Sequence, residues 1–312
     1  MNIFSFPLKI IKRFIYIVVY NPTRKIYRKI IRYSVYTNPK FLRLSSKPYI
    51  SGDTFRKISD HIFDETKTLN VSSVKKNQIV FLKTDLKDIY FKEFHPKIQN
   101  EYLLITHNSD HNVLLKDMDY LDEKIIHWFS VNLSFKAHDK ISLLPIGFEN
   151  RRYQNNGKLS NLNSAYKLKE EKTKLVLASF SISTNYYKRK ELYEISILNN
   201  LIDNKIFNTP REYINNLKKY KFLLCPEGNG IDTHRVWESL LVNTVPIMLN
   251  SSFSKNLSSL GIPVFTVDSW NELNELSEAE LNSVYEKYKS FEFNKYVKFD
   301  YWINTIYSKK TS

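Results

Sequence analysis

The stretch KFLLCPEGNGIDTHRVWESLLVNTVPIML, residues 221–249, decides the fold class of this chain. Its two ends, KFLLC (221–225) and TVPIML (244–249), are apolar runs of strand length. Between them a polar loop, PEGNGI, leads into a helix with Asp232 or Thr233 as its N-cap and with a buried stripe of Val236, Trp237, Leu240 and Leu241. A strand, a helix and a second strand in this order predict a parallel sheet that binds ligands at the carboxyl ends of its strands.

The rest of the chain repeats this alternation in two series. The first series has predicted strands at 79–83, 102–107, 124–132 and 141–147. The second has strands at 174–180, 205–208, 221–225, 244–249 and 263–267, with helices over about 187–200, about 210–219 and from about 233. Residues 150–173 are rich in Asn, Ser and Lys and predict a linker or long surface connection, and residues from about 271 to 308 read as helical.

These patterns predict an α/β protein with two Rossmann-like domains and a basic helical segment before them. We place the basic amphipathic segment at 1–46, a first α/β domain at 47–160, a second α/β domain at 170–292 and a C-terminal helix at 293–312. A length of 312 residues suits two domains, and a hydrophobic fraction of 42% is enough to bury two cores. The single cysteine, Cys225, excludes an intramolecular disulfide and indicates a reducing compartment.

Positive charge is concentrated at the N-terminus. Residues 1–50 hold eleven Lys or Arg and no acid, so most of the net charge of +15 lies there. Apolar residues recur at helical spacing opposite these cations, and the longest uncharged apolar run, FIYIVVY, is far short of the roughly 20 residues of a membrane span. We interpret 1–46 as an interfacial anchor on an anionic membrane surface, with the protein on the cytoplasmic side of the cell membrane.

Two alternatives to the anchor stay open, a solvated basic face and a helix that docks a partner. Nucleic acid is not an expected partner, because the aromatic residues of this segment share the apolar face and do not alternate with the cations.

The loop and helix after residue 225 predict a nucleotide site. Gly228 and Gly230, with Asn229 between them, let the backbone approach a ligand, and a helix N-terminus at Asp232 and Thr233 offers free N–H groups to an anion. The other predicted nucleotide-site residues are His234, the fixed cation Arg235, Glu238 for a ribose diol, and Arg189 for a phosphate. The alternatives are a capped helix with a surface Arg–Glu pair, and a solvated Arg189 within KRKE.

The same stretch resembles the C-terminal motif of exostosin-type glycosyltransferases (family 47), of ribitol xylosyltransferase relatives and of bacterial exostosin-like proteins. The shared pattern is a Cys-Pro-x-Gly loop, an Arg and a Glu on the following helix, and a Val-Pro-Ile strand. Weaker likeness extends over 47–270, through KPYISGDTFR, YLLITHNSD, HWFSVN, LLPIGFEN and FSISTNYYKRKELY. This chain is shorter than animal exostosins and lacks their cysteines and lumenal stem, which favours a cytoplasmic bacterial enzyme.

The resemblance implies the two-domain GT-B fold and the transfer of a sugar from a nucleotide-sugar donor, UDP-linked in our expectation. The acceptor would be a glycan or a lipid-linked oligosaccharide in cell-surface polysaccharide synthesis, and transfer would be inverting and would need neither metal nor cofactor. Two other classes stay open: a non-catalytic nucleotide- or carbohydrate-binding protein, and a membrane-associated scaffold whose active part is the basic segment.

An inverting transfer needs a general base for the acceptor hydroxyl, and we expect it in the first half of the chain. Asp110, in the loop HNSDHN after a predicted strand, is the first candidate and Asp53 the second. An alternative role for Asp53 is to cap a helix TFRKISDHIF (54–63). His107 and Glu149 follow, each with a structural hydrogen-bonding role as its alternative.

A D-x-D pair, Asp117 and Asp119, is the competing motif, because GT-A glycosyltransferases hold a divalent metal on such a pair. Three-residue matches of this kind arise often by chance, and this one lies in the acid-rich loop KDMDYLDEK. The sequence-based expectation is therefore transfer without a metal.

Overall fold

The computed structural model describes residues 43–153, 156–167 and 170–310. The chain divides into two units, Met1–Arg43 and Leu44–Ser312, and the described helices and strands lie in the second. The predicted membrane-associating segment therefore lies almost entirely outside the described residues. Within the described ranges, no helix has both the length and the apolar character needed to cross a membrane.

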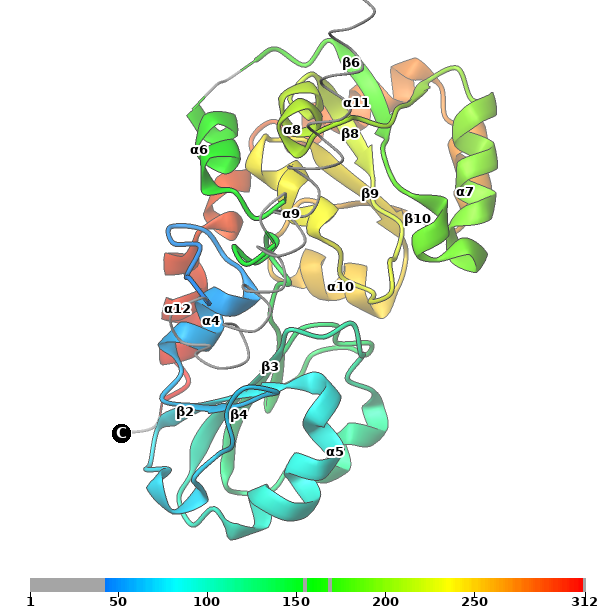
Figure 1. Cartoon of the computed structure of the whole chain (residues 1–312). Coiled ribbons are helices and arrows are strands. Elements are labelled where there is room, and N and C mark those ends of the chain that lie inside the picture. Colours follow the sequence, from blue (N-terminus) through cyan, green and yellow to red (C-terminus); the bar gives the residue numbers. More distant parts are fainter. Residues whose placement is uncertain (1–42, 154–155, 168–169, 311–312) are drawn as a thin grey trace, which may run out of the picture. The chain divides into compact units, whose positions relative to one another are not determined.

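The first sheet is parallel and is built from five strands in the order β1-β2-β3-β4-β5 (Figure 1). The strands are β1 (His61–Phe63), β2 (Gln78–Lys83), β3 (Tyr102–His107), β4 (Ile125–Ser130) and β5 (Ile141–Leu143). All six residues of β3 are buried, as expected for a central strand of a parallel sheet that is covered on both faces. Helices α4 (Gly52–Ile58) and α5 (Lys87–Ile89) belong to this half.

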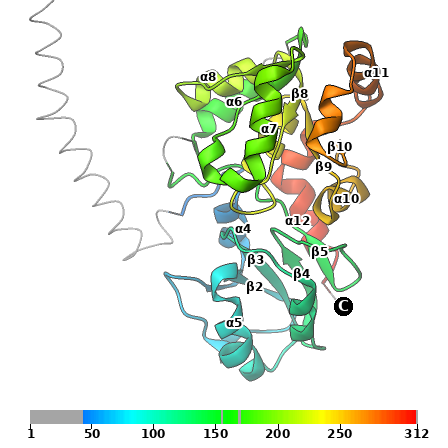
Figure 2. The ribbon, with the colours of Figure 1, turned by 90° about the vertical axis from the view of Figure 1, so that its right-hand side faces the viewer.

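The second sheet is also parallel, with the order β10-β9-β8-β6-β7. Its strands are β6 (Lys174–Ala178), β7 (Ile202–Asn204), β8 (Tyr220–Leu224), β9 (Val245–Leu249) and β10 (Phe265–Val267). Helices α7 (Tyr186–Leu198), α8 (Pro210–Leu217), α9 (His234–Leu241), α10 (Ser252–Ser259) and α11 (Glu278–Tyr288) cover its faces (Figure 2). The chain leaves β6 towards β7 and returns to the opposite side of β6 as β8, so the topological switch point lies between β6 and β8.

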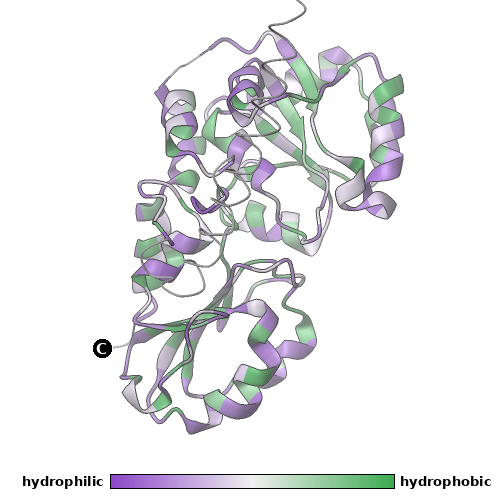
Figure 3. Ribbon diagram, viewed as in Figure 1, coloured by the Kyte–Doolittle hydropathy of each residue, from purple (hydrophilic) through white to green (hydrophobic). Residues whose placement is uncertain are grey.

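The predicted α/β architecture with two parallel sheets is confirmed. The strands of both sheets are largely hydrophobic, whereas the helices mix hydrophobic and hydrophilic stretches (Figure 3). This division is typical of strands buried between two helical layers. The predicted helical C-terminus is present as α11 and α12 (Phe299–Tyr307).

Three sequence-based predictions were wrong in detail. The proposed helix 54–63 ends near Ile58, its N-cap is Ser51 and not Asp53, and His61–Phe63 pairs with β2 as an edge strand. The strand expected at 205–208 is three residues earlier, at β7. Finally, the stretch 150–173 contains the helix α6 (Leu159–Lys167), which buries Leu162 and Ala165.

The C-terminal helix α12 joins the two halves. The N–H of Phe299 donates to Pro48 O at 2.9 Å, and its ring lies 6.1 Å from that of Phe55 in α4. Trp302 is fully buried and packs edge-on against Trp237 of α9, with ring centroids 6.1 Å apart. This helix therefore anchors both α4, beside the first sheet, and α9, beside the second.

Candidate active site

The loops that follow β6 and β8 meet at the switch point of the second sheet. Residues 179–181 follow β6, and residues 225–230 follow β8. Ligands of open parallel sheets bind in the crevice at this position, outside the carboxyl ends of the strands. The predicted donor-site residues lie on these loops and on the helices α7 and α9 beside them.

Two arginines are held at this crevice by backbone carbonyl groups. Arg189 is 1% exposed; its Nε donates to Glu227 O and its Nη1 to Ser181 O, both at 2.7 Å. Arg235 Nε donates to Ser179 O at 2.7 Å. Burial and the neighbouring Arg235 lower the pKa of Arg189 to about 10. Neither guanidinium has a carboxylate within 4.0 Å among the described residues, and the carboxylate that Arg235 influences is Glu238, one turn further along α9.

The start of α9 adds to this positive site. Thr233 is its N-cap, but no side chain caps the helix, and the buried Thr233 hydroxyl finds no hydrogen-bond partner in the part of the chain that the structure describes. The Val236 N–H donates to Thr233 O at 3.1 Å, and no side chain of the described residues occupies the N–H groups before it, which lie at the positive end of the helix dipole. The unpartnered hydroxyl adds a further donor.

Contacts within the protein explain why two positions of this loop are glycine. A Cβ on Gly230 would lie 2.7 Å from Asn132 Nδ2, and a Cβ on Gly228 would lie 3.3 Å from Arg189 Nη2. The Gly228 N–H donates to Gly230 O at 3.0 Å. Gly230 is therefore needed because the first half of the chain comes close, whereas Gly228 keeps the face of Arg189 clear.

Asp232 connects the two halves of the chain. It is 2% exposed, and its carboxylate accepts hydrogen bonds from the Ile146 N–H at 2.7 Å and from Trp237 Nε1 at 2.9 Å. Its own N–H donates to Asn132 Oδ1 at 2.9 Å. With both oxygens occupied, we assign Asp232 to positioning α9 and not to direct contact with a donor.

Replacing Asp232 with Asn is expected to reduce the free energy of unfolding by about 1–3 kcal/mol, because the amide nitrogen takes the place of one oxygen and cannot accept the N–H bound there. Burial raises the pKa of this carboxyl from 3.8 to about 7. Its contribution to stability is therefore fully present below about pH 4 and is lost as the pH rises towards 7. Urea unfolding at pH 4.5 and 7.5 measures both effects, and identical pH dependence in the two proteins would contradict the assignment.

Glu238 lies one turn after Arg235 on α9. Burial raises the pKa of its carboxyl, and the neighbouring His234 and Arg235 act in the opposite direction.

A polar cavity of about 360 Å³ lies next to the start of α9. Its lining includes Asp110, Glu149 and His234, which come from three separate segments. Asn229 Nδ2 donates to Asp110 Oδ2 at 3.3 Å, and Glu149 Oε2 lies 3.7 Å from His234 Nε2. Since His234 directly precedes Arg235, this cavity adjoins the anion site.

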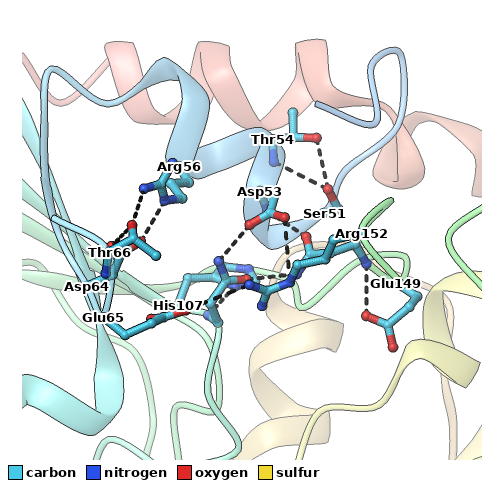
Figure 4. A network of polar contacts seen from close by, with 12 residues as sticks. Ser51, Asp53, Thr54, Arg56, Asp64, Glu65, Thr66, His107, Glu149 and Arg152 are labelled. Atoms are coloured by element: carbon cyan, nitrogen blue, oxygen red, sulfur yellow. Dashed lines mark hydrogen bonds and ion pairs between the residues drawn. The ribbon is translucent and has the colours of Figure 1, made fainter. Parts of the chain in front are cut away.

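His107 lines this cavity, and Asp53 lies next to its lining residues Gly52 and Asn108. His107 Nε2 donates to Pro145 O at 2.9 Å and its Nδ1 accepts the Asn108 N–H at 2.7 Å, while burial lowers its pKa to about 4. Both ring nitrogens are engaged, so we assign His107 a structural role. Asp53 is fully buried and its Oδ1 accepts from Asn108 Nδ2 at 3.0 Å, within the network of Figure 4.

The two aspartates of the D-x-D pair do not converge. Asp117 is buried, pairs with Lys87 and accepts the Leu114 N–H at 2.8 Å, whereas Asp119 is exposed. Asp117 is thus engaged in holding its own turn.

A second cavity, of about 280 Å³, opens on the other side of the loop after β8. Apolar side chains and one lysine–glutamate pair line it, among them Tyr187, Lys188, Glu227, Met248, Phe253 and Trp270. Sequence reasoning did not find this cavity, because its residues come from α7, the β8 loop, β9, α10 and the segment after β10.

Neither a protein-family model nor a curated protein matches the chain. Among solved structures, it is similar to the E. coli trehalose-6-phosphate protein bound with UDP-2-fluoro glucose, at 10% identity and a TM-score of 0.41, over 77% of this chain and 74% of that one. It is also similar to the pneumococcal O-GlcNAc transferase GtfA in complex with UDP and GlcNAc, at 11% identity and a TM-score of 0.35. That match covers 77% of this chain and 58% of GtfA.

A structure of the GtfA/B complex is similar at 10% identity and a TM-score of 0.37, over 76% of this chain and 58% of the other. These similarities are too remote to carry an activity over. The predicted exostosin family stays a hypothesis.

Proposed function

We propose that this protein is a glycosyltransferase that takes its sugar from a nucleotide diphosphate donor. The observation that carries the proposal is the pair of guanidinium groups, Arg189 and Arg235, at the switch point of a parallel sheet without a carboxylate partner among the described residues. Arg189 is buried, and both burial and the neighbouring Arg235 disfavour its charge, so an anion bound between the two guanidinium groups would stabilise them. A diphosphate supplies that charge and suits the helix N-terminus beside them.

The surrounding groups suit the rest of a nucleotide. The apolar cavity beside Trp270 and Phe253 is wide enough for a base, and Glu238 can accept hydrogen bonds from a ribose diol. We expect a UDP-linked donor and no metal, because the two arginines can neutralise the diphosphate by themselves.

The acceptor binds in the polar cavity and Glu149 acts as its general base. Glu149 takes the proton of the acceptor hydroxyl, the hydroxyl oxygen attacks the anomeric carbon of the donor sugar, and the bond from that carbon to the diphosphate breaks. The leaving nucleoside diphosphate keeps the electron pair and is stabilised by Arg189 and Arg235. This route inverts the anomeric configuration.

We choose Glu149 over the predicted Asp110 as the base because the Glu149 side chain is only 22% exposed and lies beside His234, the first residue of α9.

The natural acceptor is a glycan or a lipid-linked oligosaccharide used for a cell-surface polysaccharide. The basic segment 1–46 would hold the protein on the anionic inner face of the cell membrane. Binding of the full-length protein to anionic vesicles at low and high salt tests this location, and equal binding to neutral vesicles would contradict it.

A thermal-shift panel of nucleotides tests the proposal directly. We expect nucleoside diphosphates and nucleotide sugars, but not free monosaccharides, to raise the unfolding temperature, also with EDTA present. A ligand at 100 times its dissociation constant adds about 2.7 kcal/mol of stability. If no diphosphate stabilises the protein, the donor site is wrongly assigned. Binding without release of nucleoside diphosphate to any acceptor would instead indicate a non-catalytic nucleotide-binding protein.

A further inference from the structure

Both cations of the polar cavity are already neutralised. Lys83 Nζ lies 3.3 Å from Asp85 Oδ2 and 3.7 Å from Glu65 Oε2. Arg152 Nη1 lies 3.8 Å from Glu65 Oε1, and its Nε lies 3.9 Å from Asp53 Oδ2. Three carboxylates thus face two cations, and the cations have no spare charge for a bound anion.

Two further carboxylates of the cavity have no lysine or arginine within 4.0 Å in the described ranges. Asp110 contacts the amide of Asn229, and Glu149 has His234 at 3.7 Å. The other histidine of the lining, His107, is neutral because burial lowers its pKa to about 4. The cavity therefore carries an excess of negative charge.

The neighbouring donor site has the opposite charge. In the described ranges neither Arg189 nor Arg235 has a carboxylate within 4.0 Å, and the start of α9 adds its positive dipole end. The two environments meet at consecutive residues, because His234 lines the acidic cavity and Arg235 donates to Ser179 O at the switch point. The two substrates of a transfer would thus be sorted by charge.

We infer that the group bound in the polar cavity is a polyhydroxyl group without negative charge, such as an unphosphorylated sugar. The inference rests on the proposed function, since it names the class of acceptor. Hydroxyl groups of a sugar donate hydrogen bonds to Asp110 and Glu149, whereas a phosphate or carboxylate is repelled by them. For a lipid-linked acceptor, the phosphate must lie outside the cavity, at least one sugar away from the reacting hydroxyl.

The charge of the cavity can be measured without knowing the acceptor. A Ser109→Cys variant of the full-length protein places a thiol in the lining, and the native Cys225 is buried, with a raised pKa, and gives little background. The rates of modification by a cationic and by an anionic methanethiosulfonate are compared. Both reagents attack the same thiolate, so the ratio of the two rates reports the local potential.

We expect the cationic reagent to react about tenfold faster at Ser109→Cys, and this preference to fall at least about threefold when Asp110→Asn is added. The control is Ser72→Cys, on the exposed turn after Asn70, whose ratio should not respond to Asp110→Asn. Equal rates, or a faster anionic reagent, at Ser109→Cys would overturn the inference.

An acceptor assay of the unmodified protein covers the case in which the cysteine variant does not fold. Uncharged alkyl glycosides are compared with the same glycosides bearing a phosphate, and release of nucleoside diphosphate is measured. We expect the phosphate to lower kcat/KM by about tenfold or more. Equal or better use of the phosphorylated acceptor, or transfer to none but anionic acceptors, would contradict the inference. Nucleotide stabilisation is measured separately, so loss of the donor site and loss of the charge preference are distinguishable.

Discussion

Replacing Arg235 with alanine is expected to weaken the binding of a nucleoside diphosphate by about 10- to 100-fold. A hydrogen bond to a charged group contributes about 1.5–3 kcal/mol, and the Arg235 guanidinium can make such a bond with a phosphate oxygen while its Nε remains on Ser179 O. Arg189 is fully buried and fixed by two carbonyl groups, so Arg189→Lys is the milder test there. A lysine keeps the charge but cannot reach both carbonyl groups and a phosphate together.

Titration calorimetry with UDP measures these affinities. Arg211→Ala is a matched control, because Arg211 is an exposed arginine on α8 of the same half of the chain. The control should bind within about threefold of the unmodified protein, as expected for a surface charge outside a site. Affinity of Arg235→Ala in the same range would remove the observation on which the proposed function depends.

The sheets were largely predictable because their central strands are buried on both faces. Strands such as YLLITH (102–107) and KFLL (221–224) are mostly continuous apolar runs. A strand with one face in solvent would instead alternate apolar and polar residues. Sequence reasoning missed one strand, His61–Phe63, and misplaced another, Ile202–Asn204. Both are edge strands of three residues. Three residues give no periodicity, and their pairing with β2 and β6 is decided by tertiary contacts.

The donor site was partly predictable for a local reason. A strand, a glycine loop and a helix lie within thirty residues, so Arg235 could be placed at the helix start from the sequence alone. The role of Gly230 could not be predicted from the sequence, because the side chain that comes close to it is Asn132, about a hundred positions earlier. The hydrogen bond of Asp232 could not be predicted for the same reason, since its partner Ile146 belongs to the other half.

The acceptor cavity was the least predictable part. It is formed by segments around residues 52, 83–85, 107–110, 146–153 and 234, which no local pattern connects. Asp53, in α4, and His107, at the end of β3, lie at this cavity, but Asp53 Oδ1 and His107 Nε2 are hydrogen-bonded within the protein. Burial and hydrogen bonding distinguish Asp53 and His107 from Asp110 and Glu149, and neither property can be read from the sequence.

Replacing Glu149 with glutamine is expected to lower kcat for sugar transfer by about 10²- to 10⁴-fold, the usual contribution of a general base. Glutamine keeps the size of the side chain and can still accept the Asn150 N–H, but it cannot take a proton at neutral pH. UDP affinity should stay within about threefold, because no Glu149 atom is needed in the donor site. Asp110→Asn should instead raise the acceptor KM, since its carboxylate orients hydroxyl groups at the mouth of the same cavity.

The pair of variants decides between the two carboxylates. Steady-state release of UDP at several acceptor concentrations separates kcat from KM in both proteins. A large loss of kcat in Asp110→Asn with little change in Glu149→Gln would reverse the assignment and make Asp110 the base, as the sequence first indicated. Because Glu149 lies 3.7 Å from His234, at the head of the helix that carries Arg235, we expect the base to be the carboxylate nearer the leaving diphosphate. There the proton is removed next to the anomeric carbon that the acceptor oxygen attacks.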